Sequence, residues 1–185
     1  MSIVLMGMKH CGKSTLARRL AEATGRRFYD TDDVLEETYR RRTGARYSCR
    51  EIFSLHGEAY WDGLELAAVQ TLAERLALCD DEAVIALGGR TAMNPEAQPI
   101  VRKLGTTVLL DVDVDELYRR VAAGGIPPFL DPADPAGSFA RLCEQRLAVY
   151  RQLAEVVVPL TGLSPDEALQ ELRKQLAEQS ASQEK

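Results

Sequence analysis

A glycine-rich segment near the start of the chain, residues 7–15 with the sequence GMKHCGKST, holds the strongest candidates for chemistry. Two glycines separated by four residues, followed by Lys13 and Ser14, fit the pattern of a phosphate-binding loop. Gly7 and Gly12 would let the backbone curl so that its N–H groups surround phosphate oxygens. Lys13 can reach the β- and γ-phosphates of a nucleotide, and Ser14 can bind magnesium. The pattern predicts nucleotide binding; the alternative is a chance match on a glycine turn.

The segments on either side of this loop support the prediction. Residues 3–5, Ile-Val-Leu, predict a short buried strand before it. After the loop, Leu16, Leu20 and Ala23 recur at helical spacing, and Gly25 is a typical helix stop. The helix would present the positive end of its dipole to the same phosphates.

Two carboxylates follow the next predicted strand, residues 26–30. Asp30 ends this strand, and Thr31 or Asp32 can cap a helix predicted over residues 33–42. A phosphoryl acceptor needs a carboxylate near its hydroxyl, and magnesium needs oxygen ligands, so both aspartates are candidates. The alternative is that one only ends a strand and the other only caps a helix.

The rest of the chain alternates between strand and helix patterns. Residues 83–87 form a continuous apolar run, typical of a central parallel strand, and end at Gly88 and Gly89. Further strands are predicted at 107–110 and 156–158, and helices at 48–56, 58–78, 95–104, 114–121, 138–153 and from 165. This order predicts an α/β fold, a parallel sheet with helices on both faces.

Two details of these segments can be checked directly. In the short helix, Ile52, Phe53 and Leu55 are expected to point inward. Residues 124–132 are too rich in glycine and proline for a regular element and are interpreted as a lid.

Composition limits the other possibilities. The chain has 185 residues, 45% of them hydrophobic and 28% charged, which suits one domain with a core. The net charge of −5 argues against nucleic-acid binding, and apolar runs are too short for a membrane span. The four cysteines form no CxxC pair and are interpreted as reduced thiols of a cytoplasmic protein without a signal peptide. We expect a monomer, with a domain over residues 1–177 and a frayed tail over 178–185.

Taken together, the motifs resemble the shikimate kinase family, small phosphate-loop kinases of the nucleoside-monophosphate-kinase type. The matching residues, in order, are the phosphate loop, Phe28-Tyr29-Asp30-Thr31-Asp32, Thr43-Gly44, Glu51-Ile52-Phe53, Gly57-Glu58, Glu65, Gly88-Gly89 and the helix from Arg146 to Tyr150. The resemblance implies a five-stranded P-loop NTPase fold with a substrate-binding region over residues 31–62 and a lid over 122–137. It implies ATP- and Mg2+-dependent phosphoryl transfer to a small hydroxylated molecule, with shikimate as the default acceptor.

The resemblance also implies individual roles. Lys13 and Asp32 would be catalytic, Asp32 by taking the proton of the acceptor hydroxyl, while Ser14 and Asp30 would hold magnesium. The expected ATP-binding residues are Gly7, Cys11, Gly12, Lys13, Ser14, Thr15 and Arg120, the last lying against adenine. The expected substrate-binding positions are Asp32, Asp62, Gly88, Gly89, Arg90 and Arg146, with Arg146 gripping the substrate carboxylate.

Three positions depart from the family pattern. Asp62 stands where the family carries a carboxylate-binding arginine, so it could pair with Arg146 or lie exposed on its helix. Arg90 replaces the third glycine of a Gly-Gly-Gly turn and is interpreted as a surface residue in preference to a ligand. Pro127 aligns with the lid arginine, and residues 121–140 contain no Arg or Lys. These departures mark a divergent member and leave two alternatives: a kinase with a less anionic acceptor, or a catalytically weak nucleotide-binding paralogue that acts as a regulator or binding partner.

Overall fold

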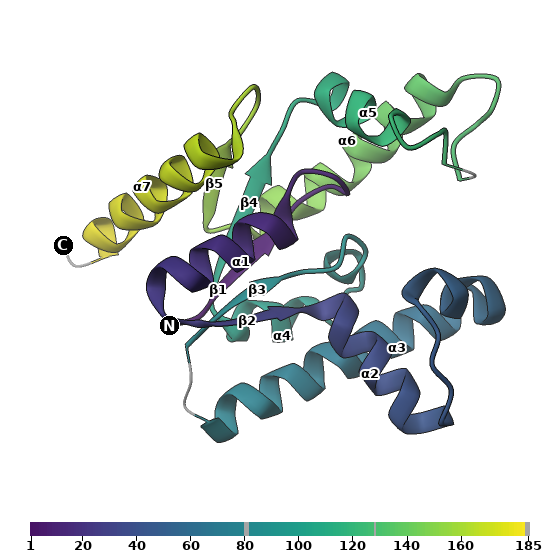
Figure 1. The fold of residues 1–185 in the computed structure, drawn as a ribbon, viewed down its shortest axis with the longest axis horizontal. Coiled ribbons are helices and arrows are strands. Elements are labelled where there is room, and N and C mark those ends of the chain that lie inside the picture. Colours follow the sequence, from purple (N-terminus) through teal and green to yellow (C-terminus); the bar gives the residue numbers. More distant parts are fainter. Residues whose placement is uncertain (80–81, 128, 184–185) are drawn as a thin grey trace.

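Five parallel strands form the centre of the fold, in the order β2-β3-β1-β4-β5 (Figure 1). The computed structural model describes residues 1–79, 82–127 and 129–183. The strands are β1 (Ile3–Met6), β2 (Arg27–Asp30), β3 (Ala83–Ala86), β4 (Thr106–Asp111) and β5 (Val156–Pro159). β1 and β3 are entirely buried because helices cover both faces of the sheet. The predicted five-stranded parallel sheet is confirmed.

The helices pack in two layers around this sheet (Figure 1). α1 (Lys13–Thr24) and α7 (Pro165–Gln183) contact each other and lie on one face. α4 (Gln98–Leu104) and α6 (Pro135–Leu153) pack against strands from the other face. The remaining helices are α2 (Thr31–Thr43), α3 (Cys49–Cys79), α5 (Val114–Ala122) and the short 3-10 turn η1 (Thr91–Met93). Within the described residues, no helix combines the length and apolar character that crossing a membrane requires.

Several helix boundaries differ from the prediction for local reasons. α2 begins earlier because Asp30, and neither Thr31 nor Asp32, is its cap: the Asp30 side chain accepts from the N–H of Asp32 at 3.1 Å. α6 begins at Pro135, since Asp134 caps it and proline suits the first turn. α4 begins only at Gln98, which places Pro99 in its first turn.

The two helices predicted on either side of residue 57 form the single element α3, broken at Gly57, where φ is 74° and ψ is −174°. Ile52 is buried as predicted, but the inward placement of Phe53 and Leu55 is wrong, because both side chains are exposed. They lie on the outer side of the short segment before the break, which has only one buried residue, Ile52.

The end of the chain also differs from the prediction. α7 continues as a helix past residue 178 to Gln183, and the Ser180 hydroxyl donates to the carbonyl of Leu176 at 3.0 Å. A capping box is present at its start, since the N–H of Ser164 donates to Glu167 and the N–H of Glu167 donates back to Ser164. Residues 184–185 of the predicted frayed tail lie outside the described residues.

Candidate active site

The candidate site lies at the carboxyl ends of β1, β2 and β3, where loops from neighbouring parallel strands meet. The loop after β1 is the predicted phosphate loop. Gly7 and Gly12 have φ values of 150° and 96°, and residues other than glycine rarely adopt such values. His10 holds the same left-handed region with φ of 66°, and strain of this kind often marks a functional loop.

The loop is shaped to receive an anion. Gly12 begins α1 without any side-chain cap, so the first-turn N–H groups of the helix lack the acceptor that a capping side chain would supply. The ammonium group of Lys13 donates to the carbonyls of Gly7 and Met8, both at 2.9 Å, and so lies over the loop. Cys11 is buried and fills the inside of the loop.

The two candidate magnesium ligands lie together. The Ser14 hydroxyl donates to the Asp30 carboxylate at 2.7 Å, which joins the start of α1 to the end of β2. The nearby carboxyl of Asp32 is desolvated and faces the charge of Asp30, and these two effects raise the pKa of Asp32 to about 6. The positive charge of Lys13 opposes this shift. No group of three or more His, Cys, Asp or Glu residues suited to a metal occurs among the residues the structure describes.

The Gly88–Gly89 turn after β3 brings Asp32 and Arg146, two residues predicted to bind the acceptor, close to each other. A Cβ atom on Gly88 would lie 2.7 Å from a carboxylate oxygen of Asp32, so any side chain here would force the Asp32 carboxylate to move. A Cβ atom on Gly89 would lie 4.0 Å from Nη1 of Arg146. The turn is held by Thr31, whose hydroxyl accepts from the N–H of Gly88 at 2.7 Å. Asp32 and Arg146 therefore lie beside adjacent residues of one turn.

The charge arrangement around Asp62 differs from the predicted one. Asp62 accepts from Nη2 of Arg90 at 3.4 Å, and the same nitrogen donates to Glu58. Arg90 is therefore not a simple surface residue, and the Asp62–Arg146 pair considered from the sequence is not formed. Burial lowers the pKa of Arg146, and no hydrogen bond or ion pair is found for its side chain in the described part of the chain.

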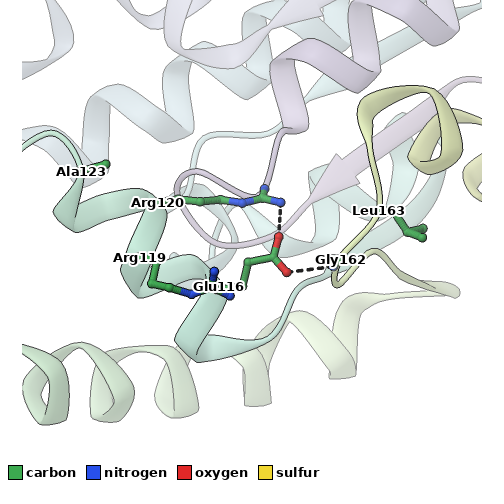
Figure 2. A pocket seen from close by; sticks show the side chains of 6 residues that line it. All are labelled: Glu116, Arg119, Arg120, Ala123, Gly162 and Leu163. Atoms are coloured by element: carbon green, nitrogen blue, oxygen red, sulfur yellow. Dashed lines mark hydrogen bonds and ion pairs between the residues drawn. The ribbon is translucent and has the colours of Figure 1, made fainter.

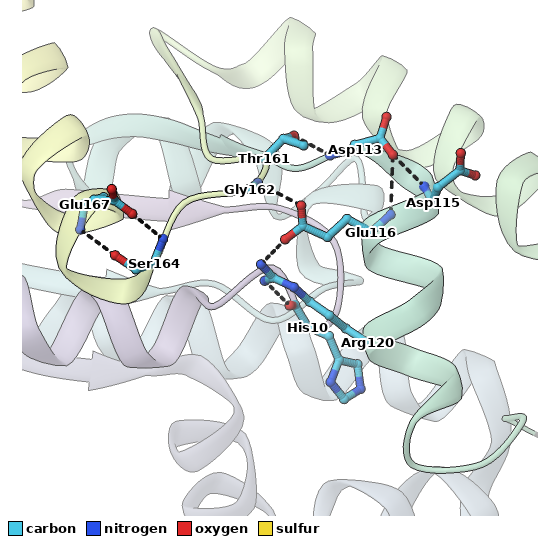
Figure 3. Close-up of polar contacts among 9 residues, drawn as sticks. All are labelled: His10, Asp113, Asp115, Glu116, Arg120, Thr161, Gly162, Ser164 and Glu167. Atoms are coloured by element: carbon cyan, nitrogen blue, oxygen red, sulfur yellow. Dashed lines mark hydrogen bonds and ion pairs between the residues drawn. The ribbon is translucent and has the colours of Figure 1, made fainter.

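A cavity of about 480 Å³ is lined by residues of α5 and of the loop after β5 (Figure 2). Arg120 lines it and donates to the carbonyl of His10 at 3.2 Å, while Glu116 pairs with Arg120 and accepts from the N–H of Gly162 at 2.8 Å (Figure 3). This network joins the phosphate loop, α5 and the loop after β5. It places Arg120 beside the loop that would bind the phosphates.

Sequence reasoning assigned no role within the site to several residues that shape it. Tyr150 donates to the carbonyl of Gly89 at 2.5 Å, and Thr31 supports Gly88. Glu116 was detectable, because it stands four residues before Arg120 on a predicted helix. Tyr150 and Thr31 gave no comparable signal, since their partners lie far away in the sequence.

A phosphate loop after the first strand, a parallel sheet with strand order 2-3-1-4-5 and an acid-lined glycine turn define a small phosphate-loop kinase. Comparison with known proteins gives its family. A family model described as shikimate kinase matches residues 9–177. The chain belongs to the shikimate kinase family and is an ATP-dependent kinase.

Individual relatives agree with this placement. A shikimate kinase from Bordetella avium is 35% identical over 163 residues, which span 88% of this chain and 72% of that protein. One from Rhodococcus jostii is 32% identical over 175 residues, covering 95% and 97% of the two chains. The solved structure of shikimate kinase from Acinetobacter baumannii in complex with shikimate has a TM-score of 0.79 and 25% identity, and covers 96% of this chain and 93% of that one.

Proposed function

We propose that this protein transfers the γ-phosphoryl group of ATP to a hydroxyl of shikimate. The observation that carries the proposal is the position of Asp32 and Arg146 beside adjacent glycines of one turn, close to the phosphate loop. This arrangement offers a base for a hydroxyl and a cation for a carboxylate on one small molecule.

The nucleotide would be held by Gly7, Cys11, Gly12, Lys13, Ser14 and Thr15, with its base in the cavity beside Arg120. ATP with magnesium supplies the phosphoryl group and neutralises part of its charge. Ser14 and Asp30 are the residues proposed to hold the metal, which suits Mg2+ because this ion usually has few protein ligands and completes its shell with phosphates and water. Lys13 would turn from the loop carbonyls to the outer phosphates.

Asp32 is the proposed general base. With a pKa near 6, it is ionised at neutral pH and can accept the proton of the acceptor hydroxyl as the new oxygen–phosphorus bond forms. Gly88 leaves room for the acceptor beside this carboxylate, and Arg146 would bind the acceptor's carboxylate. The remaining alternatives, a less anionic acceptor or a nucleotide-binding regulator, become outcomes of the test.

The test measures ADP release with purified protein, ATP and Mg2+ against shikimate and a panel of neutral ring alcohols and polyols, with an Asp32→Asn variant beside the wild type. We expect turnover with shikimate in the wild type and a loss of at least about 100-fold in the variant. Turnover only with neutral acceptors would favour the different kinase, and nucleotide binding without turnover on any acceptor would favour the regulator.

A further inference from the structure

Arg90 directly follows the Gly88–Gly89 turn, here called the acceptor turn, and pairs with two carboxylates. Its backbone directly follows Gly89, and its Nη2 atom is shared by Glu58 and Asp62, which stand one helical turn apart on α3. The guanidinium carbon lies 5.8 Å from the centre of the Phe53 ring, within cation–π range. The side chain keeps 30% of its surface exposed, so it is fixed in place and still accessible.

Arg146 comes to the same turn from α6. Its guanidinium would lie 4.0 Å from a Cβ atom on Gly89, and the positive charge of Arg90 contributes to its lowered pKa. Arg90 already pairs with Glu58 and Asp62, whereas the half-buried guanidinium of Arg146 has no ion pair within the described residues. Such an uncompensated cation is unfavourable, and an anion bound beside Gly89 would relieve that cost.

We propose that Arg90 and Arg146 together bind the carboxylate of the acceptor, and that Asp62 and Glu58 are positioning residues that hold Arg90 toward it. The charge of Asp62 is then partly offset by Arg90, whose single guanidinium is shared between Asp62 and Glu58. This inference rests on the proposed function, because it assumes that the acceptor carries a carboxylate.

The first experiment compares shikimate with its methyl ester, which lacks the negative charge, in the wild type and in Arg90→Met. Loss of one charge-assisted hydrogen bond should raise KM for shikimate by about 10- to 100-fold. KM for ATP and for the ester should change little. Arg41→Met is the matched control, because Arg41 is exposed near the C-terminal end of α2 and pairs with Glu37, whereas the turn contacts the N-terminal end of this helix; it should leave all three values unchanged.

A rescue separates a binding role from a structural one. Because the side chains at positions 62 and 90 touch, an arginine at 62 can reach the same place. Asp62→Arg added to Arg90→Met should recover at least about tenfold in KM for shikimate. Asp62→Ala should raise the KM for shikimate in the wild-type background and leave it unchanged in the Arg90→Met background. This is the result expected if Asp62 acts only by positioning Arg90.

The outcomes for the two proposals differ. Shikimate turnover in the wild type with an unchanged KM in Arg90→Met, or equal losses for shikimate and its ester, would overturn the Arg90 inference alone. No turnover or binding of shikimate in the wild type would overturn both the inference and the proposed function.

Discussion

Glu65 lies buried on α3 beside the acceptor turn, with one carboxylate oxygen accepting from the Thr91 hydroxyl at 3.0 Å. Burial raises the pKa of Glu65 to about 7, while hydrogen bonding to Thr91 and Trp61 and the charge of Arg90 oppose the rise. An unfolded glutamate has a pKa near 4.5. Between these two values the folded chain binds a proton that the unfolded chain releases, so stability falls as pH rises.

This shift predicts the behaviour of Glu65→Gln, which keeps the acceptor for Thr91 and removes the titration. The free energy of unfolding of the variant, relative to wild type, should rise by about 2–3 kcal/mol between pH 5 and pH 8, from 1.36 kcal/mol per unit of pKa. Urea titrations at both pH values measure it. A parallel pH dependence in the two proteins would show that Glu65 titrates normally.

Among individual residues, the sequence predicted those whose position is determined by a single local motif. Lys13, Ser14 and Gly12 follow from the loop pattern, and Ser14 meets Asp30 because the ends of adjacent elements converge. It missed the partner of Asp62, because Arg90 is 28 residues away and reaches it only through the packing of α3 beside the turn. Pairings of this kind depend on three-dimensional packing and leave no periodic signal.

Among the elements, α3 depends on the break at Gly57, whose backbone conformation is almost restricted to glycine. A Cβ atom there would meet nothing within 4 Å, so the cost of Gly57→Ala is backbone strain alone. We expect a loss of about 1–3 kcal/mol in the free energy of unfolding. Gly63→Ala is the matched control on the same helix: it also has free space, but its backbone is helical, so it should gain up to about 1 kcal/mol. Equal effects of the two substitutions would contradict this account.

The loop between α5 and α6 lacks the cationic side chains that could assist phosphoryl transfer. Residues 121–140 contain no Arg or Lys, so closure of the proposed lid cannot neutralise the transferring phosphoryl group. Turnover should be slow, and Pro127→Arg should raise kcat by at least about tenfold, since a positioned arginine can contribute ~10³–10⁵. Ala133→Arg adds the same charge elsewhere in the loop and should have no such effect. A wild-type kcat of ~10–100 s⁻¹, within the ordinary kinase range, would mean that another cation serves this role.

Most strands and helices could be predicted because the apolar residues of their sequence patterns are the residues that are buried in the structure. The predicted starts of α2 and α6 were late because Asp30 and Asp134 cap these helices, and acidic residues before a helix also suit a turn. The inward placement of Phe53 and Leu55 failed because a segment of two helical turns can be apolar without being buried.

For the whole molecule, the parallel sheet places every strand's carboxyl end at one edge, so the proposed nucleotide and acceptor regions lie at the same edge. α1 is central to this design, because it packs on β3 and α7 while its N-terminus carries the phosphate loop. Ligand binding at that loop is therefore coupled to unfolding of the whole chain. A ligand that binds only the folded state stabilises it by mass action.

The last prediction uses this coupling to test Lys13. ADP with Mg2+ at 100 times its Kd should add about 2.7 kcal/mol of stability. For a domain of this size, that raises Tm by about 5–10 °C. In Lys13→Ala, a 100-fold weaker affinity would reduce the shift at the same concentration to about 1 °C. Lys103→Ala, which removes an exposed lysine from α4, should keep the full shift. The comparison uses the shift and not Tm itself, because Lys13 also holds the carbonyls of Gly7 and Met8. An equal shift in Lys13→Ala and wild type would show that Lys13 does not bind the phosphates.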